Sequence, residues 1–205
     1  MIVNTAALAR VLLILDATDR LTSSRVSDLD LARLAYFVDA FSSLWALRAI
    51  DRFRLKSEEP RTILVRRALD RLVVSGLVVP TDLRVDEGAV AHLSARYAVD
   101  RPRAAPVLAA VRRTDVGLRE AELVDEVVYA AAAMLEGDLE EAIRLDAGQS
   151  DRRLGPGDIV DLESTSSGTS VTARAFEGGV TSAANAEAEL THLYMAHLER
   201  SIHRG

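Results

Sequence analysis

The sequence contains no cysteine, which excludes disulfide bonds and thiolate metal sites and is typical of a reducing compartment. No apolar run approaches the roughly 20 residues that a transmembrane helix needs. The N-terminal stretch has an apolar patch but no basic leader, and Arg10 and Asp16 flank the patch as they would on an amphipathic helix. We therefore expect no signal peptide and a cytoplasmic protein.

Patterns that carry catalysis or bind metal are also missing. There is no G-x-S-x-G motif, and residues 155–158 (GPGD) lack the Gly-Lys-Ser/Thr ending of a phosphate loop and precede a strand, so a turn is expected there. The four histidines do not form ligand pairs: His92, His192, His197 and His203. Carboxylate pairs such as Asp28 and Asp30 suit helix starts. We predict no enzyme activity, no cofactor and no metal site.

Length and charge limit the remaining classes. The chain has 205 residues, 49% of them apolar, which is enough for one large domain or two small ones with a real core. Its net charge is −6 and its pI about 5.3. This balance argues against a protein that grips nucleic acid with its whole surface, although a local basic face remains compatible with it.

The strongest pattern lies in residues 57–93. The sequence SEEP at residues 57–60 suits the start of a helix, and Gly76 stands where a left-handed C-cap would end it. Between them, apolar residues recur at helical spacing: Leu64, Val65, Ala68, Leu69, Leu72 and Val73. A short β-branched run at residues 77–79, a polar turn at residues 86–88 and a second short run at residues 89–91 follow, and a third strand is expected to close at Tyr97 and Val99. Helix, glycine, strand, turn and strand predict a winged helix, a helix-turn-helix completed by a β-hairpin wing.

Helical periodicity continues on both sides of this pattern. Two helices are expected before it, the first capped by Asn4 or Thr5 and the second by Ser27 or Asp28. The first buries one side, formed by Ala7, Leu8, Val11, Leu12 and Leu15.

The remainder of the chain predicts a helical extension and a C-terminal unit. A strand is expected at residues 159–162, a returning strand at 169–176 and a final helix at about 182–203. The predicted fold class is α+β, mainly α: a winged helix-turn-helix followed by a helical extension and a C-terminal β-hairpin plus helix. The corresponding domain boundaries are 1–99, 100–147 and 148–205.

Two sets of residues are candidates for contacts with other molecules. The arginines that fall off the apolar stripe or in the wing are candidate DNA or partner contacts: Arg61, Arg66, Arg67, Arg71 and Arg84. However, Glu58 and Glu59 would place negative charge at the end of the helix that approaches DNA. Asp70 can also partly neutralise Arg66. The final helix is a candidate docking helix through Leu190, Tyr194, Leu198 and Ile202.

Three stretches resemble the middle component of the ABC-three-component bacterial defence systems that include Lamassu. They are ALARVLLILDA (residues 7–17), DLDLARLAYFVDAF (28–41) and LVRRALDRLVVSGLV (64–78), and ARYAV (95–99) follows the wing in the expected order. The resemblance does not cover the chain beyond Gly148, and a His-containing loop of some members is absent. It implies a non-enzymatic subunit that docks on an SMC- or Rad50-like ABC ATPase and helps hold an effector until foreign DNA is sensed.

Two hypotheses therefore remain. The first is an adaptor subunit of an ATPase-driven anti-phage complex, with DNA contacted only within that complex. The second is a stand-alone winged-helix transcription regulator that forms a homodimer through the C-terminal helix. A small hydrolase would need a polar site for which the sequence offers no residues.

Overall fold

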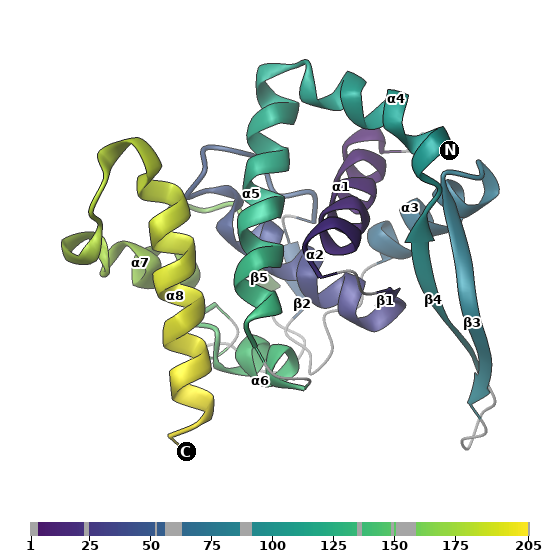
Figure 1. Cartoon of the computed structure of the whole chain (residues 1–205). Helices are drawn as coiled ribbons and strands as arrows, with labels where there is room; N and C mark the ends of the chain where they lie inside the picture. The colour runs from purple at the N-terminus through teal and green to yellow at the C-terminus, as the bar shows by residue number, and fades with distance from the viewer. Residues whose placement is uncertain are drawn as a thin grey trace.

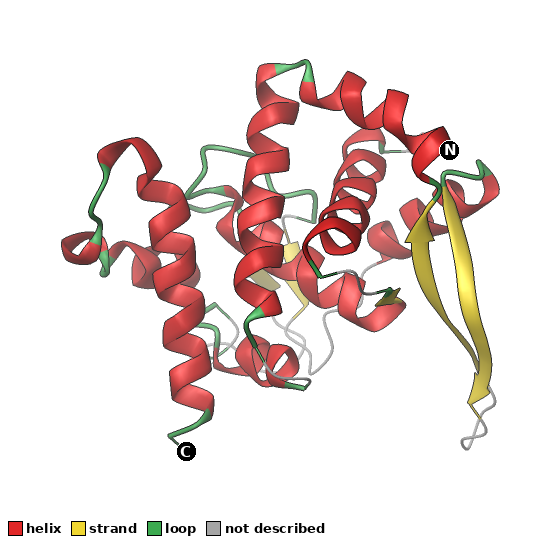
Figure 2. Ribbon diagram, viewed as in Figure 1, coloured by secondary structure: helices red, strands yellow, loops and turns green. Residues whose placement is uncertain are grey.

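The computed structural model describes residues 4–22, 25–51, 53–55, 63–86, 92–134, 137–148, 150 and 159–204. These residues are mainly helical and carry a small antiparallel sheet, which confirms the predicted α+β, mainly α class (Figure 1, Figure 2). The elements are α1 (Thr5–Leu21), β1 (Val26–Ser27), α2 (Asp28–Ser42), β2 (Phe53–Leu55), α3 (Ile63–Val74), β3 (Val78–Asp86), β4 (His92–Val99), α4 (Arg101–Arg112), α5 (Asp115–Ala132), α6 (Asp138–Leu145), β5 (Ile159–Asp161), α7 (Gly168–Arg174), the 3-10 turns η1 (Glu177–Gly179) and η2 (Ala183–Asn185), and α8 (Ala186–Ile202).

Several predicted helix ends are confirmed by their caps. The Asn4 side chain accepts hydrogen bonds from two backbone N–H groups in the first turn of α1, at 3.1 and 3.4 Å. Ser27 caps α2 by accepting a hydrogen bond from the Asp30 N–H at 3.0 Å. Gly76 has a φ of +70°, so it takes the left-handed conformation expected after α3. The predicted start of that helix at residues 57–60 lies outside the described residues.

Helix α1 lies at the centre of the molecule, and its burial is wider than the sequence pattern indicated. All residues from Arg10 to Thr18 are buried, because α2, α3, α4, α5 and β4 all contact α1. Arg10 and Asp16, which we expected at the edges of an amphipathic helix, are only 2% and 4% exposed. The expectation of one buried side is therefore corrected: the middle of this helix, residues 10–18, is buried on all sides.

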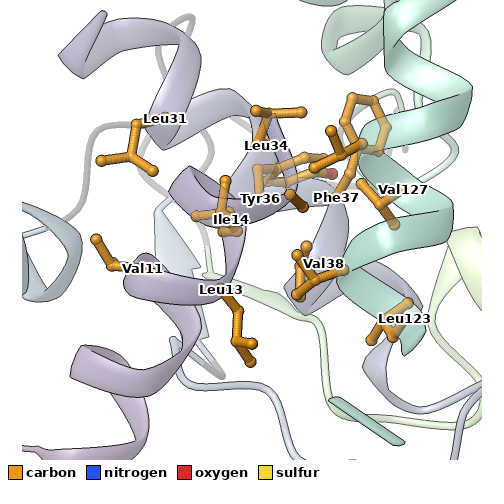
Figure 3. Packing of buried hydrophobic residues seen from close by; sticks show 14 of the residues in the cluster. Val11, Leu13, Ile14, Leu31, Leu34, Tyr36, Phe37, Val38, Leu123 and Val127 are labelled. Atoms are coloured by element: carbon orange, nitrogen blue, oxygen red, sulfur yellow. The ribbon is translucent and has the colours of Figure 1, made fainter. Parts of the chain in front are cut away.

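One hydrophobic cluster connects the three parts of the chain that the sequence separated. It includes Leu13 from α1, Val124 from α5 and Tyr194 from α8. Figure 3 shows side chains of α1, α2 and α5 directed into this cluster, among them Val38 and Val127. The predicted helical extension and C-terminal unit therefore share buried apolar surface with the first 99 residues.

The three-stranded sheet has the order β1-β4-β3, with both pairs antiparallel. Strand β4 pairs with β1, where Tyr97 lies opposite Val26, and with β3, where Val99 lies opposite Val78. The run predicted as a third strand at Tyr97 is the end of β4 itself, because the hairpin strands are longer than the short apolar runs suggested. The predicted strand at residues 89–91 lies outside the described residues. Figure 1 shows the hairpin extending away from the helical body.

The predicted C-terminal β-hairpin is wrong. Residues 168–174 form helix α7. Ser167 caps this helix, because its side chain accepts a hydrogen bond from the Ser170 N–H at 3.2 Å. Strand β5 is present as expected, but it pairs antiparallel with β2, far earlier in the chain. The side chains of Thr169 and Ser170 are buried and bond to Asp146 and Ser43. These distant contacts outweigh the local β-propensity of the segment.

Candidate functional site

The outward face of α3 carries most of the predicted contact residues. Val65, Ala68, Leu69 and Leu72 face the core, which leaves the guanidinium groups of α3 on the surface. We call the exposed residues Arg66, Arg67 and Arg71 of α3 the arginine surface, whereas the exposed Arg84 lies on the hairpin strand β3. Arg61 lies outside the described residues. Within the described part of the chain, the structure brings three of the five predicted arginines onto one helix.

The charges of the arginine surface are unequally neutralised. Arg66 forms ion pairs with Asp28 of α2, where Nη1 and Oδ2 are 3.4 Å apart, and with Asp70, where Nε and Oδ1 are 3.3 Å apart. Among the described residues, Arg67 and Arg71 have no ion-pair partner. The positive potential of α3 therefore comes mainly from Arg67 and Arg71.

Large aliphatic side chains are exposed beside these arginines, and the sequence analysis missed them. Ile63 and Val74, at the two ends of α3, are 70% and 79% exposed, and Leu83 of β3 is 59% exposed. The signal was present in the sequence, because neither Ile63 nor Val74 belongs to the apolar stripe of the helix. The surface therefore combines positive charge with apolar area.

A groove separates the N-terminal half of α2 from α3. It has a volume of about 430 Å³. Leu31 and Leu69 form its buried floor, and Ile63, Arg66 and Arg67 lie along the α3 side. It falls within the size range of about 300–1,000 Å³ that is common for binding pockets. The groove and the arginine surface therefore share two residues, Arg66 and Arg67.

The predicted docking face of α8 lies inside the chain. Leu190, Tyr194 and Leu198 are at most 4% exposed, and Ile202 is partly buried against the same cluster. Helices α5, α6 and α7 contact α8 and cover this face. Its apolar periodicity therefore reflects packing within the chain, and this face is not available to a partner in this structure.

Tyr194 also belongs to a buried polar cluster around Asp146, which is fully buried. Asp146 accepts hydrogen bonds from the hydroxyl groups of Tyr36 at 2.6 Å, Tyr194 at 2.7 Å and Thr169 at 2.9 Å. It also accepts one from the backbone N–H of Gly148 at 2.9 Å. The cluster joins α2, α7 and α8 to the end of α6. Because it is closed to solvent, it stabilises the fold and offers no site for a substrate.

We expect titration of the Tyr194 hydroxyl to make the stability of the fold depend on pH. Burial raises the pKa of Tyr194 above its ordinary value of 10.0, and the negative charge of the nearby Asp146 carboxylate is the second cause of this rise. The unfolded chain then loses this proton at a lower pH than the folded chain does. The contribution is fully present below pH about 10 and is lost as the pH rises further, by up to about 1.4 kcal/mol per pH unit.

We therefore expect urea unfolding between pH 9 and about 11 to show a decline in stability that is weaker in Tyr194→Phe. Tyr129→Phe is the matched control, since Tyr129 is 62% exposed. The control should keep the decline seen in the unsubstituted protein. Equal declines in all three proteins would contradict this role of Tyr194.

His192 and His203 each pair with a single carboxylate. His192 Nε2 lies 2.5 Å from Glu126 Oε2, and His203 Nε2 lies 3.2 Å from Asp138 Oδ2. Within the described ranges, no three histidine or acidic side chains are grouped so as to hold a metal ion. The GPGD stretch at residues 155–158 lies outside them. No helix in the described part of the chain is long and apolar enough to cross a membrane.

Comparison of the chain with known proteins gave no match among family models, curated proteins or solved structures. The geometry of α3, its groove and the hairpin, together with the resemblance noted in the sequence, is therefore the basis for a proposed function.

Proposed function

We propose that this chain is a non-catalytic winged-helix adaptor subunit. In this proposal it docks on an SMC- or Rad50-like ABC ATPase and links that ATPase to an effector in an anti-phage defence complex. The resemblance of residues 7–17, 28–41 and 64–78 to the middle component of such systems names the partner class. The structure supplies two supporting arguments, one from topology and one from the surface of α3.

The topology supports a winged helix in the first half of the chain. Helix α1, strand β1, helices α2 and α3 and the hairpin β3–β4 follow in the order typical of this fold, and the sheet order is β1-β4-β3. A longer connection than usual separates α2 from α3, and it contains β2. In this proposal, α3 is the helix that meets the ligand, as the recognition helix does in helix-turn-helix proteins.

The observation that carries the proposal is the exposed aliphatic surface on α3. Ile63 and Val74 lie 70% and 79% exposed at its ends, and the Arg66 guanidinium is already paired with two carboxylates. A helix that reads DNA meets phosphates and polar base edges, for which Asp28 and Asp70 are unfavourable neighbours. Exposed aliphatic side chains next to arginine are typical of surfaces that bind protein.

The second candidate is a winged-helix DNA-binding regulator. It is favoured by Arg67, Arg71 and Arg84, which are all exposed and could contact phosphates. The homodimer expected for such a regulator finds no support, because the apolar face of α8 that would form it is covered within the chain.

A tagged pull-down from the native host, run beside a DNA shift assay at about 150 mM salt, tests the two candidates. We expect recovery of a large ABC-type ATPase and no sequence-specific DNA shift. Weak phosphate contacts are screened at this ionic strength, so a shift that persists would report specific binding. A sharp, sequence-specific shift without an ATPase would refute the adaptor proposal and favour the regulator.

A further inference from the structure

The groove between α2 and α3 has the features of a selective binding site. Most of its described lining is apolar: Leu31, Ala32, Val65 and Leu69 line it, and Ile63 stands 70% exposed at its side. Such a surface gains free energy when an apolar side chain displaces water from it, at about 25 cal/mol per Å² of apolar area buried. The occupant must therefore bring at least one apolar side chain.

The charges beside the groove select the rest of the occupant. Arg66 is held by Asp28 and Asp70, whereas Arg67 and, one turn later, Arg71 have no ion-pair partner among the described residues. Charge complementarity therefore favours carboxylates over basic groups near Arg67. A nucleic acid could satisfy the arginines, but its phosphate backbone provides no aliphatic side chain for the groove.

We propose that this groove binds an acidic segment of a partner protein, which inserts an aliphatic side chain between α2 and α3 and pairs its carboxylates with Arg67 and Arg71. This inference builds on the proposed adaptor function and names the chemistry of the docking segment. The contact is of the amphipathic, peptide-in-groove kind, in which apolar anchors supply affinity and flanking charges supply selectivity.

Two synthetic peptides with the same leucine spacing test the groove, one with glutamate and one with lysine at the remaining positions. In fluorescence anisotropy with the full chain, we expect saturable binding of the glutamate peptide and none of the lysine peptide. Ile63→Asp and Arg67→Glu should each weaken binding by at least about tenfold. Val171→Asp on α7 and Arg113→Glu after α4 are the matched controls, and both positions are exposed.

Equal binding of both peptides, or unchanged affinity in Ile63→Asp and Arg67→Glu, would overturn the proposal. Binding of duplex DNA that Arg67→Glu abolishes, with no binding of the glutamate peptide, would identify a phosphate site instead. Both substitutions are at exposed positions, and thermal melts check that the variants remain folded.

The same variants in the pull-down separate this inference from the adaptor proposal. If the unsubstituted chain and Ile63→Asp recovered the ATPase equally, the groove proposal would be refuted and the adaptor proposal would stand. Binding of the glutamate peptide without any ATPase recovered would refute the adaptor function and retain the groove.

Discussion

Replacing Asp146 with alanine is expected to lower the free energy of unfolding by about 4 kcal/mol. Asp146 is fully buried and accepts hydrogen bonds from Tyr36, Tyr194, Thr169 and the Gly148 N–H. Its removal takes away the acceptor that these donors share in the interior, and each buried group that is left unsatisfied costs about 1–3 kcal/mol. The donors come from four separate parts of the chain, so local relaxation cannot pair them again.

Urea unfolding measures this effect, with Glu122→Ala as the matched control. Glu122 is an exposed carboxylate on α5, and its loss should change stability by no more than about 0.5 kcal/mol. Tyr36→Phe and Tyr194→Phe each remove one donor and should cost about 1–2 kcal/mol. If Asp146→Ala unfolded like the control, the buried carboxylate would not be a major source of stability.

Replacing Arg10 with methionine is expected to cost about 3–5 kcal/mol, because it removes one partner of a buried ion pair with Asp39. Arg10 is 2% exposed and donates to the carboxylate of Asp39, to Glu120 at 2.8 Å and to the backbone oxygen of Arg48 at 3.1 Å. It therefore connects α1, α2 and α5 and the chain that follows α2. Methionine fills a similar volume, so the loss measures charge and hydrogen bonding more than packing.

A double-mutant cycle in urea unfolding tests this pair. Asp39→Asn removes the charge of the partner, so Arg10→Met combined with Asp39→Asn should cost less than the sum of the two single changes. Arg113→Met, at an exposed position after α4, is the matched control and should be nearly neutral. Strictly additive costs would show that the two side chains are not coupled.

Local chemistry explains which structural features were predictable. Asn4, Ser27 and Gly76 act within one helical turn of their own positions, so their caps follow from the sequence. The apolar stripe of α3 was predictable for the same reason, since one face of that helix meets the core. Its exposed Ile63 and Val74 could have been found as apolar residues off this stripe, but the groove that Ile63 borders also needs α2.

The errors occur where distant residues decide the outcome. Residues 169–176 alternate well enough for a strand, yet Thr169 meets Asp146 and Ser170 meets Ser43, and the segment is helical up to Arg174. Arg10 and Asp16 were expected at the edge of a helix, but ion pairs with Asp39 and with Arg112 allow their burial. Periodicity reports only on neighbours within a few turns, so it cannot reveal such partners.

The sequence alone therefore determined the mainly helical class, the principal caps and the arginines of α3, because propensity, capping and periodicity act over a few residues. The tertiary structure decided that the middle of α1 is enclosed, that the apolar face of α8 is internal and that β5 pairs with β2. It also brought α2 beside α3 to form the groove. These features depend on contacts between segments far apart in the chain, whose free energy outweighs local preference.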